Sequence, residues 1–195
     1  DPYWKNLPLK LSSSRVEGVF DKKTADTTPD LLMEAFEPLT ASVEGEVRLV
    51  EAGLSTAAFH VAVTNTHGGE LYRASTRAGC GLGVMLRKGG EQSIGYELDS
   101  STSFASLKLE ETGSSAVEKA RKFLGAKPVE TGVFDIIFVN KEAASLFNLM
   151  VGRAVSALWV QESRSPLAGK IGEQVADERL TLIDDGTMPG GLGAR

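Results

Sequence analysis

Apolar and polar residues alternate with a period of two between about residues 43 and 110, and this alternation constrains the fold more than any other feature of the chain. Val47 and Leu49 alternate with charged neighbours, and Phe59 and Val61 alternate with smaller or polar ones. Such a pattern places apolar side chains on one face of a strand and polar ones on the other. The segment is therefore expected to form strands with one buried and one solvated face.

Turn signals divide this segment into separate runs. They lie at residues 65–69, 89–90 and 99–101 and are rich in glycine, asparagine, aspartate and serine. Short alternating runs joined by tight turns are typical of an antiparallel meander. A wholly parallel sheet would need long crossovers between its strands, and none is visible here. The sequence thus predicts a mostly antiparallel sheet.

Helix signals flank the predicted sheet on both sides. Thr28 and Pro29 suit the cap and the first position of a helix over about 28–40. A second helix is expected to begin with the capping box Ser115–Glu118 and to stop at Gly125.

The remainder of the chain alternates between apolar runs and polar connections. A buried strand is expected over 132–139, a long apolar helix from Asn140 to about Val160, and a short strand at 180–183. The predicted fold class is therefore α+β, a mostly antiparallel sheet flanked by a few helices that include one long apolar helix.

The order of these elements suggests two regions. Residues 1–112 form an N-terminal α+β region, with a helix at about 28–40 followed by the meander. Residues 113–195 form a helix, strand and long-helix region that leads into an absent C-terminal half. A first residue that is not methionine and a glycine-rich end agree with a fragment.

Charge and composition exclude several classes of protein. The net charge is −5 without a dense run of Lys or Arg, which disfavours direct nucleic-acid binding. No apolar run reaches the roughly 20 residues that cross a bilayer. Cys80 is the only cysteine, so no internal disulfide is possible, and a reducing cytoplasmic compartment is expected.

Several residues that resemble functional groups have a simpler interpretation. His60 and His67 are interpreted as a strand and a turn residue rather than a metal pair. The glycines around Cys80 lack the following helix that a dinucleotide fingerprint requires, so they are expected to serve packing, and the thiol is expected to be buried and inert. The pair Asp184–Asp185 is interpreted as a turn or cap.

Two motifs carry a resemblance to a known family. Residues 61–68 read Val-Ala-Val-Thr-Asn-Thr-His-Gly, and residues 165–176 read Ser-Pro-Leu-Ala-Gly-Lys-Ile-Gly-Glu-Gln-Val-Ala. The second is followed by a probable strand and an Asp-Asp pair. This order resembles the TldD/TldE peptidase family, also called PmbA or "modulator of DNA gyrase". The resemblance covers residues 115–193 well and most of the remaining chain loosely.

The resemblance also implies that the zinc site of the family has been lost. In TldD the long helix carries His-Glu-x-x-x-His, two zinc ligands and a base. Alignment on the shared Val-Gly places Asn148, Leu149 and Arg153 at these positions. An amide and a guanidinium are poor zinc ligands, and leucine accepts no proton. The chain is therefore expected to have no catalytic residue, metal or cofactor of its own.

A zinc-less, TldE/PmbA-type subunit is the function that the resemblance implies. It would pair with a zinc-bearing TldD-like subunit, or with itself as a dimer, and help to process small unfolded polypeptides. Asn65, Ser163 and Arg164 are candidates for substrate or partner binding. The alternative that Arg164 is a surface residue without such a role stays open. Two alternatives also stay open: a peptidase active through the missing C-terminal half, and a stand-alone peptide-binding protein that uses strand edges.

Overall fold

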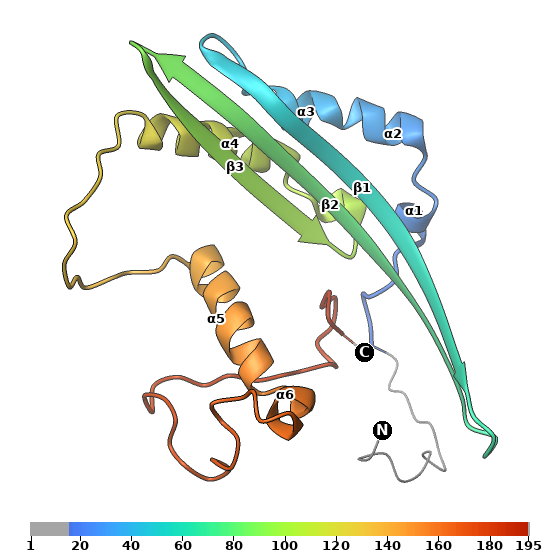
Figure 1. Cartoon of the computed structure of the whole chain (residues 1–195). Coiled ribbons are helices and arrows are strands. Elements are labelled where there is room, and N and C mark those ends of the chain that lie inside the picture. The colour runs from blue at the N-terminus through green and yellow to red at the C-terminus, as the bar shows by residue number, and fades with distance from the viewer. Residues whose placement is uncertain (1–15, 195) are drawn as a thin grey trace. The chain divides into compact units, whose positions relative to one another are not determined.

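The computed structural model describes residues 16–194, which form two compact units (Figure 1). The first unit consists of the described residues up to Pro128 together with those from Asp185 onward, and the second is Val129–Asp184. The sequence suggested a boundary after residue 112, whereas the boundary between the two units lies after Pro128. The reason is that the helix after the meander packs on the sheet and belongs to the first unit.

The first unit is built on a three-stranded antiparallel sheet in the order β1-β2-β3. The strands are β1 (Val47–Thr64), β2 (Glu70–Lys88) and β3 (Glu91–Ser101). The expected meander and its first two turns are thereby confirmed, and the third turn signal ends β3. Strand β3 pairs with β2 only from Ala78 to Lys88, so β1 and β2 continue beyond it as a two-stranded arm (Figure 1).

One face of the sheet forms the core of this unit. Alternate residues of β2 point to this face, where α3 (Phe36–Thr40) and α4 (Leu109–Phe123) cover them. Alternation along the strand delivers one apolar residue in every two to the helices. The buried cluster consists of Leu39, Val47, Cys80, Leu82, Val84, Leu86, Ala116, Val117 and Ala120.

Close contact between α4 and β3 depends on small residues. A Cβ built on Gly95 would overlap the carbonyl oxygen of Ala116 and lie 2.6 Å from the amide nitrogen of Ala120. Beside this contact, the Ser93 hydroxyl donates a hydrogen bond to the Ala120 carbonyl at 2.5 Å. The pairing of a glycine with two alanines therefore lets helix and strand approach backbone to backbone.

Helix α4 begins six residues earlier than its capping box indicated. It starts at Leu109, so Ser115 lies within the helix rather than at its cap. The earlier start is stabilised by Glu110 and Glu111 in the first turn, where negative charge favours the helix dipole. Leu109 also packs against the core cluster. The helix ends at Phe123, close to the expected stop at Gly125.

The region before the sheet forms three short helices where one was expected over 28–40. They are α1 (Lys22–Ala25), α2 (Pro29–Glu34) and α3, and a 3₁₀ turn, η1 (Phe104–Ser106), follows β3. The Thr28 hydroxyl caps α2 as predicted. The expected single helix is divided at Ala35 because Pro38 lacks an amide hydrogen for the Glu34 carbonyl and its ring crowds that group.

Asp21 joins α1 to the end of β3. Its carboxylate accepts hydrogen bonds from the Thr24 hydroxyl at 2.6 Å and the Ser103 hydroxyl at 2.9 Å. These two bonds, with that of Thr24 the stronger, hold the pKa of the Asp21 carboxyl below its usual value. The backbone amide of Asp21 donates in turn to the Thr76 hydroxyl on β2, which fixes the N-terminal segment against the sheet.

The second unit differs most from the sequence-based expectation. It contains α5 (Asn140–Ala154) and α6 (Ala157–Gln161), so the single helix expected to reach Val160 is interrupted at Val155–Ser156. Neither 132–139 nor 180–183 is a strand. A strand needs a neighbour for its backbone hydrogen bonds, and this unit has no other strand among its described residues. Val133 and Ile137 are accordingly exposed.

The length and hydrophobicity of the helices bear on whether any of them could span a membrane. Among the described residues, no helix combines the length and the hydrophobicity that crossing a bilayer would need.

We predict that Gly95→Ala destabilises the first unit by about 1–3 kcal/mol, because the added methyl group meets helix backbone that has no rotamer to change. The matched control is Gly53→Ala on β1, where an added Cβ meets nothing within 4 Å. The control should be neutral or slightly stabilising. Urea unfolding followed by circular dichroism measures both, and equal midpoints for the two variants would contradict the prediction.

Candidate functional site

The three positions aligned with the zinc motif lie on α5. Asn148, Leu149 and Arg153 are all exposed on a regular α-helix. Positions i and i+5 of such a helix point about 140° apart, so the side chains of Asn148 and Arg153 do not converge. A Cβ built on Gly152 would lie 3.4 Å from the Asn148 side-chain oxygen, which places this amide along the helix surface.

The chemistry of these three side chains does not fit zinc. They offer an amide, an alkyl group and a guanidinium, none of which is a usual zinc ligand or a base. Elsewhere in residues 16–194, no group of three or more His, Cys, Asp or Glu side chains is placed to hold a metal ion. The expectation that this chain carries no metal stays a prediction.

The burial expected for the apolar residues of this helix is wrong. Leu149 and Met150 are 56% and 62% exposed, and Phe147 is also exposed. The apolar sequence of this helix predicts that they are core residues. Their exposure follows from the missing strand at 132–139, because α5 has no sheet beside it within its own unit.

Arg153 instead takes part in an aromatic cluster with Trp159 of α6 and Arg164 after it. Its guanidinium carbon lies 5.6 Å from the centre of the Trp159 ring, and that of Arg164 lies 4.4 Å from the same centre. Both distances are within the range of a cation–π interaction. The Arg164 guanidinium also forms an ion pair with Glu162 at 3.1 Å. We name Arg153, Trp159 and Arg164 the arginine–tryptophan cluster.

A tight turn after α6 brings Arg164 back to the tryptophan. Ser163 has a φ of 56°, and it is the only non-glycine residue with positive φ in the described part of the chain. The Arg164 amide donates to the Trp159 carbonyl at 2.8 Å, and the Ser165 amide donates to the same oxygen at 3.1 Å. The buried Ser165 hydroxyl then donates to the Ala154 carbonyl at 2.5 Å, which fixes the turn to the end of α5.

The structure thus separates the predicted binding residues into two groups. Ser163 and Arg164 lie together in this turn, and Arg153 joins them through Trp159. Trp159 itself was missed in the sequence analysis, because its two arginines stand six residues before and five residues after it. No helical period links those positions. Only the turn at Ser163 brings them to one ring.

Asn65 belongs to the other unit and has a structural role there. Its side-chain oxygen accepts hydrogen bonds from the amides of His67 at 3.0 Å and Gly69 at 2.9 Å. These bonds close the turn between β1 and β2. A part of Asn65 in substrate or partner binding stays a prediction.

The histidines occupy the positions expected from the sequence. His67 lies in the β1–β2 turn, and His60 lies on β1 with its Nδ1 atom 2.6 Å from the Tyr72 hydroxyl. The aromatic ring of Phe20 packs edge-on against His60 at 5.9 Å. His60 is therefore part of a polar and aromatic contact on the arm.

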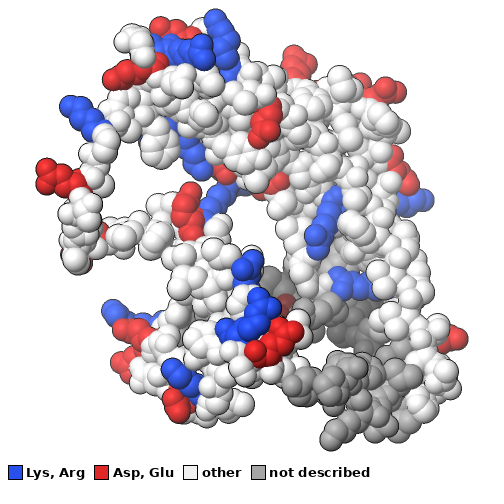
Figure 2. Space-filling view, in the orientation of Figure 1, with Lys and Arg blue, Asp and Glu red and all other residues white. Residues whose placement is uncertain are grey.

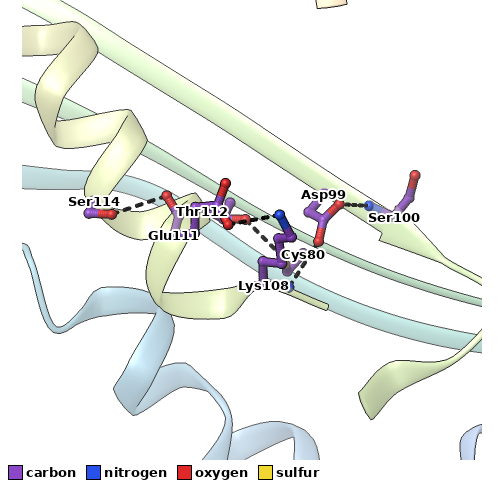
Figure 3. A network of polar contacts seen from close by, with 7 residues as sticks. All are labelled: Cys80, Asp99, Ser100, Lys108, Glu111, Thr112 and Ser114. Carbon is purple, nitrogen blue, oxygen red and sulfur yellow. Dashed lines mark hydrogen bonds and ion pairs between the residues drawn. The ribbon is translucent and has the colours of Figure 1, made fainter. Parts of the chain in front are cut away.

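Cys80 is buried, as predicted, and its thiol points toward α4 (Figure 3). The thiol donates to the Thr112 hydroxyl at 3.7 Å. Around this contact the Asp99 carboxylate accepts from the amides of Ser100 and Lys108, both at 2.9 Å. These bonds tie the end of β3 to the start of α4, so the surroundings of Cys80 are structural.

The glycines flanking Cys80 serve packing, as expected. A Cβ on Gly81 would lie 2.5 Å from Leu98 Cδ2, and one on Gly83 would lie 3.2 Å from Tyr96 Cδ2. Large side chains of β3 therefore lie across the glycines of β2 on the face of the sheet opposite α4.

Within the Asp184–Asp185 pair, Asp185 caps a turn, as expected. The Asp185 carboxylate accepts from the Thr187 hydroxyl at 2.7 Å and from the Thr187 amide at 2.8 Å. The hydroxyl, followed by the amide, holds the pKa of the Asp185 carboxyl below its usual value. This carboxylate is stabilised as the capping group of a turn.

Comparison with known proteins decides the family. The family model described as the PmbA/TldA metallopeptidase central domain matches residues 19–124, more than half of the chain. The model described as the C-terminal domain of the same metallopeptidases matches residues 131–195. The chain belongs to the PmbA/TldD metallopeptidase family. The resemblance found in the sequence is thereby confirmed.

Individual relatives agree with this assignment. A metalloprotease from Methanothermobacter thermautotrophicus is 31% identical over 157 residues, which are 77% of this chain and 34% of the relative. The chain therefore spans about a third of the length of that relative.

Two solved structures share the fold. A protein described as a modulator of DNA gyrase from Thermotoga maritima superposes with a TM-score of 0.84 at 21% identity, over 94% of this chain and 43% of that one. TldE from Thermococcus kodakarensis superposes with a TM-score of 0.80 at 22% identity, over 100% of this chain and 45% of that one.

We predict that Leu149→Ala changes the free energy of unfolding by less than about 0.5 kcal/mol, because the side chain is already more than half exposed. Leu82→Ala is the matched control on the same residue type at 0% exposure, and it should cost about 2–5 kcal/mol. Urea titrations compare the two. A Leu149→Ala loss as large as that of Leu82→Ala would show that this face of α5 is covered in solution.

Proposed function

We propose that the chain is a zinc-less subunit of a PmbA/TldD-type metallopeptidase. It acts by pairing with a zinc-bearing relative, or with a second copy of itself, and helps to enclose small unfolded polypeptides. Catalysis is the task of the zinc-bearing subunit, and this chain contributes binding surface.

The side chains at the three motif positions of α5 carry this proposal. The chain belongs to a metallopeptidase family, yet Asn148, Leu149 and Arg153 supply neither a zinc ligand nor a base. Metal-dependent hydrolysis needs donors that hold the ion and a group that accepts a proton from water. The cation–π contact of Arg153 with Trp159 supports a change of role at this position, since the side chain aligned with a ligand contacts an aromatic ring instead.

The exposed apolar residues of α5 support the pairing. Phe147, Leu149 and Met150 are exposed on one helix, and Phe147 and Met150, three residues apart, share one side of it. Contiguous exposed apolar side chains are typical of a surface that another polypeptide covers. A peptidase active in its own right remains the alternative, and the following two experiments separate the two functions.

We predict that the chain purified without a metal-affinity tag contains no stoichiometric zinc, because the positions of the family's motif offer no donors. Elemental analysis after dialysis against trace zinc measures this. About one zinc per chain would contradict the zinc-less proposal.

We further predict that co-expression with a zinc-bearing TldD-type chain gives a complex that contains zinc and cleaves unfolded peptides. The control replaces the glutamate of the partner's zinc motif by glutamine, which should preserve the complex and abolish cleavage. Size-exclusion chromatography and peptide hydrolysis report the two properties. Hydrolysis by this chain alone would favour the alternative function. The proposed pairing would be contradicted if this chain does not co-elute with the partner and is also a monomer when purified by itself.

A further inference from the structure

We propose that the arginine–tryptophan cluster binds a carboxylate group of a peptide. The inference rests on the proposed function, because it names the chemical group of the substrate that this subunit would hold. It concerns only residues of the second unit.

Two guanidinium groups converge on one aromatic ring in this cluster. The distance between the Arg153 and Arg164 guanidinium carbons cannot exceed the sum of 5.6 and 4.4 Å, their distances to the Trp159 ring centre. Like charges repel each other at such a separation, and a neighbouring anion or π system stabilises them against that repulsion. The half-buried indole ring supplies part of that stabilisation.

The two arginines of the cluster differ in their acidic partners. The Arg164 guanidinium donates a hydrogen bond to the Glu162 carboxylate at 3.1 Å. Among the described residues, none forms an ion pair or hydrogen bond with the guanidinium of Arg153. The charged groups of this arrangement are therefore two guanidinium groups and one carboxylate. Figure 2 shows basic side chains gathered with acidic ones over the region of α5 and α6.

Backbone hydrogen bonds hold the turn that carries Arg164. Ser163 adopts a left-handed conformation that is costly for a residue with a side chain. The hydrogen bonds of Arg164 and Ser165 to the Trp159 carbonyl, and of Ser165 to the Ala154 carbonyl, maintain it. Strain of this kind, held by a buried hydroxyl, is typical of positions where a side chain must point in one direction.

A carboxylate is the ligand that this arrangement suits best. A guanidinium presents paired N–H donors at the spacing of two carboxylate oxygens, and it binds them more strongly than neutral acceptors. A nucleic acid is disfavoured by the adjoining Glu162 carboxylate and by the net charge of −5. The carboxylate could come from the C-terminus of a peptide or from an Asp or Glu side chain within it.

Trp159 provides the readout. The chain has two tryptophans, so Trp4→Phe leaves Trp159 as the only indole and its fluorescence reports on the cluster. The full chain with this change is titrated with three versions of one unfolded peptide. The first has a free C-terminal carboxylate and no acidic side chain, the second is its C-terminal amide, and the third is an amide that carries one glutamate.

We expect the free-acid peptide to bind at least about tenfold more tightly than the neutral amide, as charged hydrogen bonds require. If the glutamate-bearing amide binds like the free acid, the site accepts a side-chain carboxylate as well. Arg153→Ala should abolish the preference for a carboxylate, and Arg153→Lys should restore part of it. Arg179→Ala is the matched control, because Arg179 lies in the same unit but is paired with Asp177 at 2.8 Å.

Circular dichroism of each variant separates loss of binding from loss of folding. Should Arg153→Ala fail to fold, Arg153→Lys and Arg164→Lys carry the comparison. Acid and amide peptides that bind equally would overturn the inference while leaving the zinc-less subunit intact. Displacement of the peptide by an equal concentration of inorganic phosphate would also overturn it, since the cluster would then bind any anion. Failure of the proposed function is detected separately, by zinc content and hydrolysis.

Discussion

The close approach of α4 to the sheet is the contact on which the first unit depends. A glycine on β3 lies beneath two alanines of the helix, and the Ser93 hydroxyl bonds to a helix carbonyl beside them. This proximity lets short side chains such as Ala116 and Ala120 bury Leu82 and Val84 completely. Backbone contact also orients the helix, since any larger residue at the glycine would push it away. The boundary of the unit follows from this contact, because α4 cannot be divided from the sheet.

Beyond β3 the same sheet becomes a two-stranded arm, and the physical situation changes. A two-stranded ribbon has little stability in water by itself. The arm is held where it leaves the sheet, since the Thr76 amide bonds to the Val19 carbonyl and the Arg77 guanidinium bonds to the Leu192 carbonyl. Segments from near both ends of the chain thus contribute to one structure.

The sequence predicted those elements whose signals are local. The meander, its turns and the cap at Thr28 depend on alternation and on residues that favour turns, which act over a few positions. The strand predicted at 132–139 is absent, because an apolar run indicates that its side chains favour burial but does not indicate which element would cover them. The helix expected to reach Val160 failed for a related reason, since a hydrogen bond from Ser165 to the Ala154 carbonyl stabilises its interruption. Such a contact across eleven residues leaves no periodic signal.

The candidate site shows the same division between local and non-local information. From Asn148, Leu149 and Arg153 the alignment predicts that the zinc ligands are absent, because the donor atoms of a side chain follow from its residue type alone. The contact of Arg153 with Trp159 and Arg164 depends on a turn in which Ser163 has a positive φ. Residue propensities do not predict such a turn, because serine rarely adopts this conformation. A guanidinium beside an indole ring repels a zinc ion, but it can bind a carboxylate. If Arg153 stands where relatives carry a zinc ligand, as we propose, this part of α5 attracts an anion rather than a metal ion.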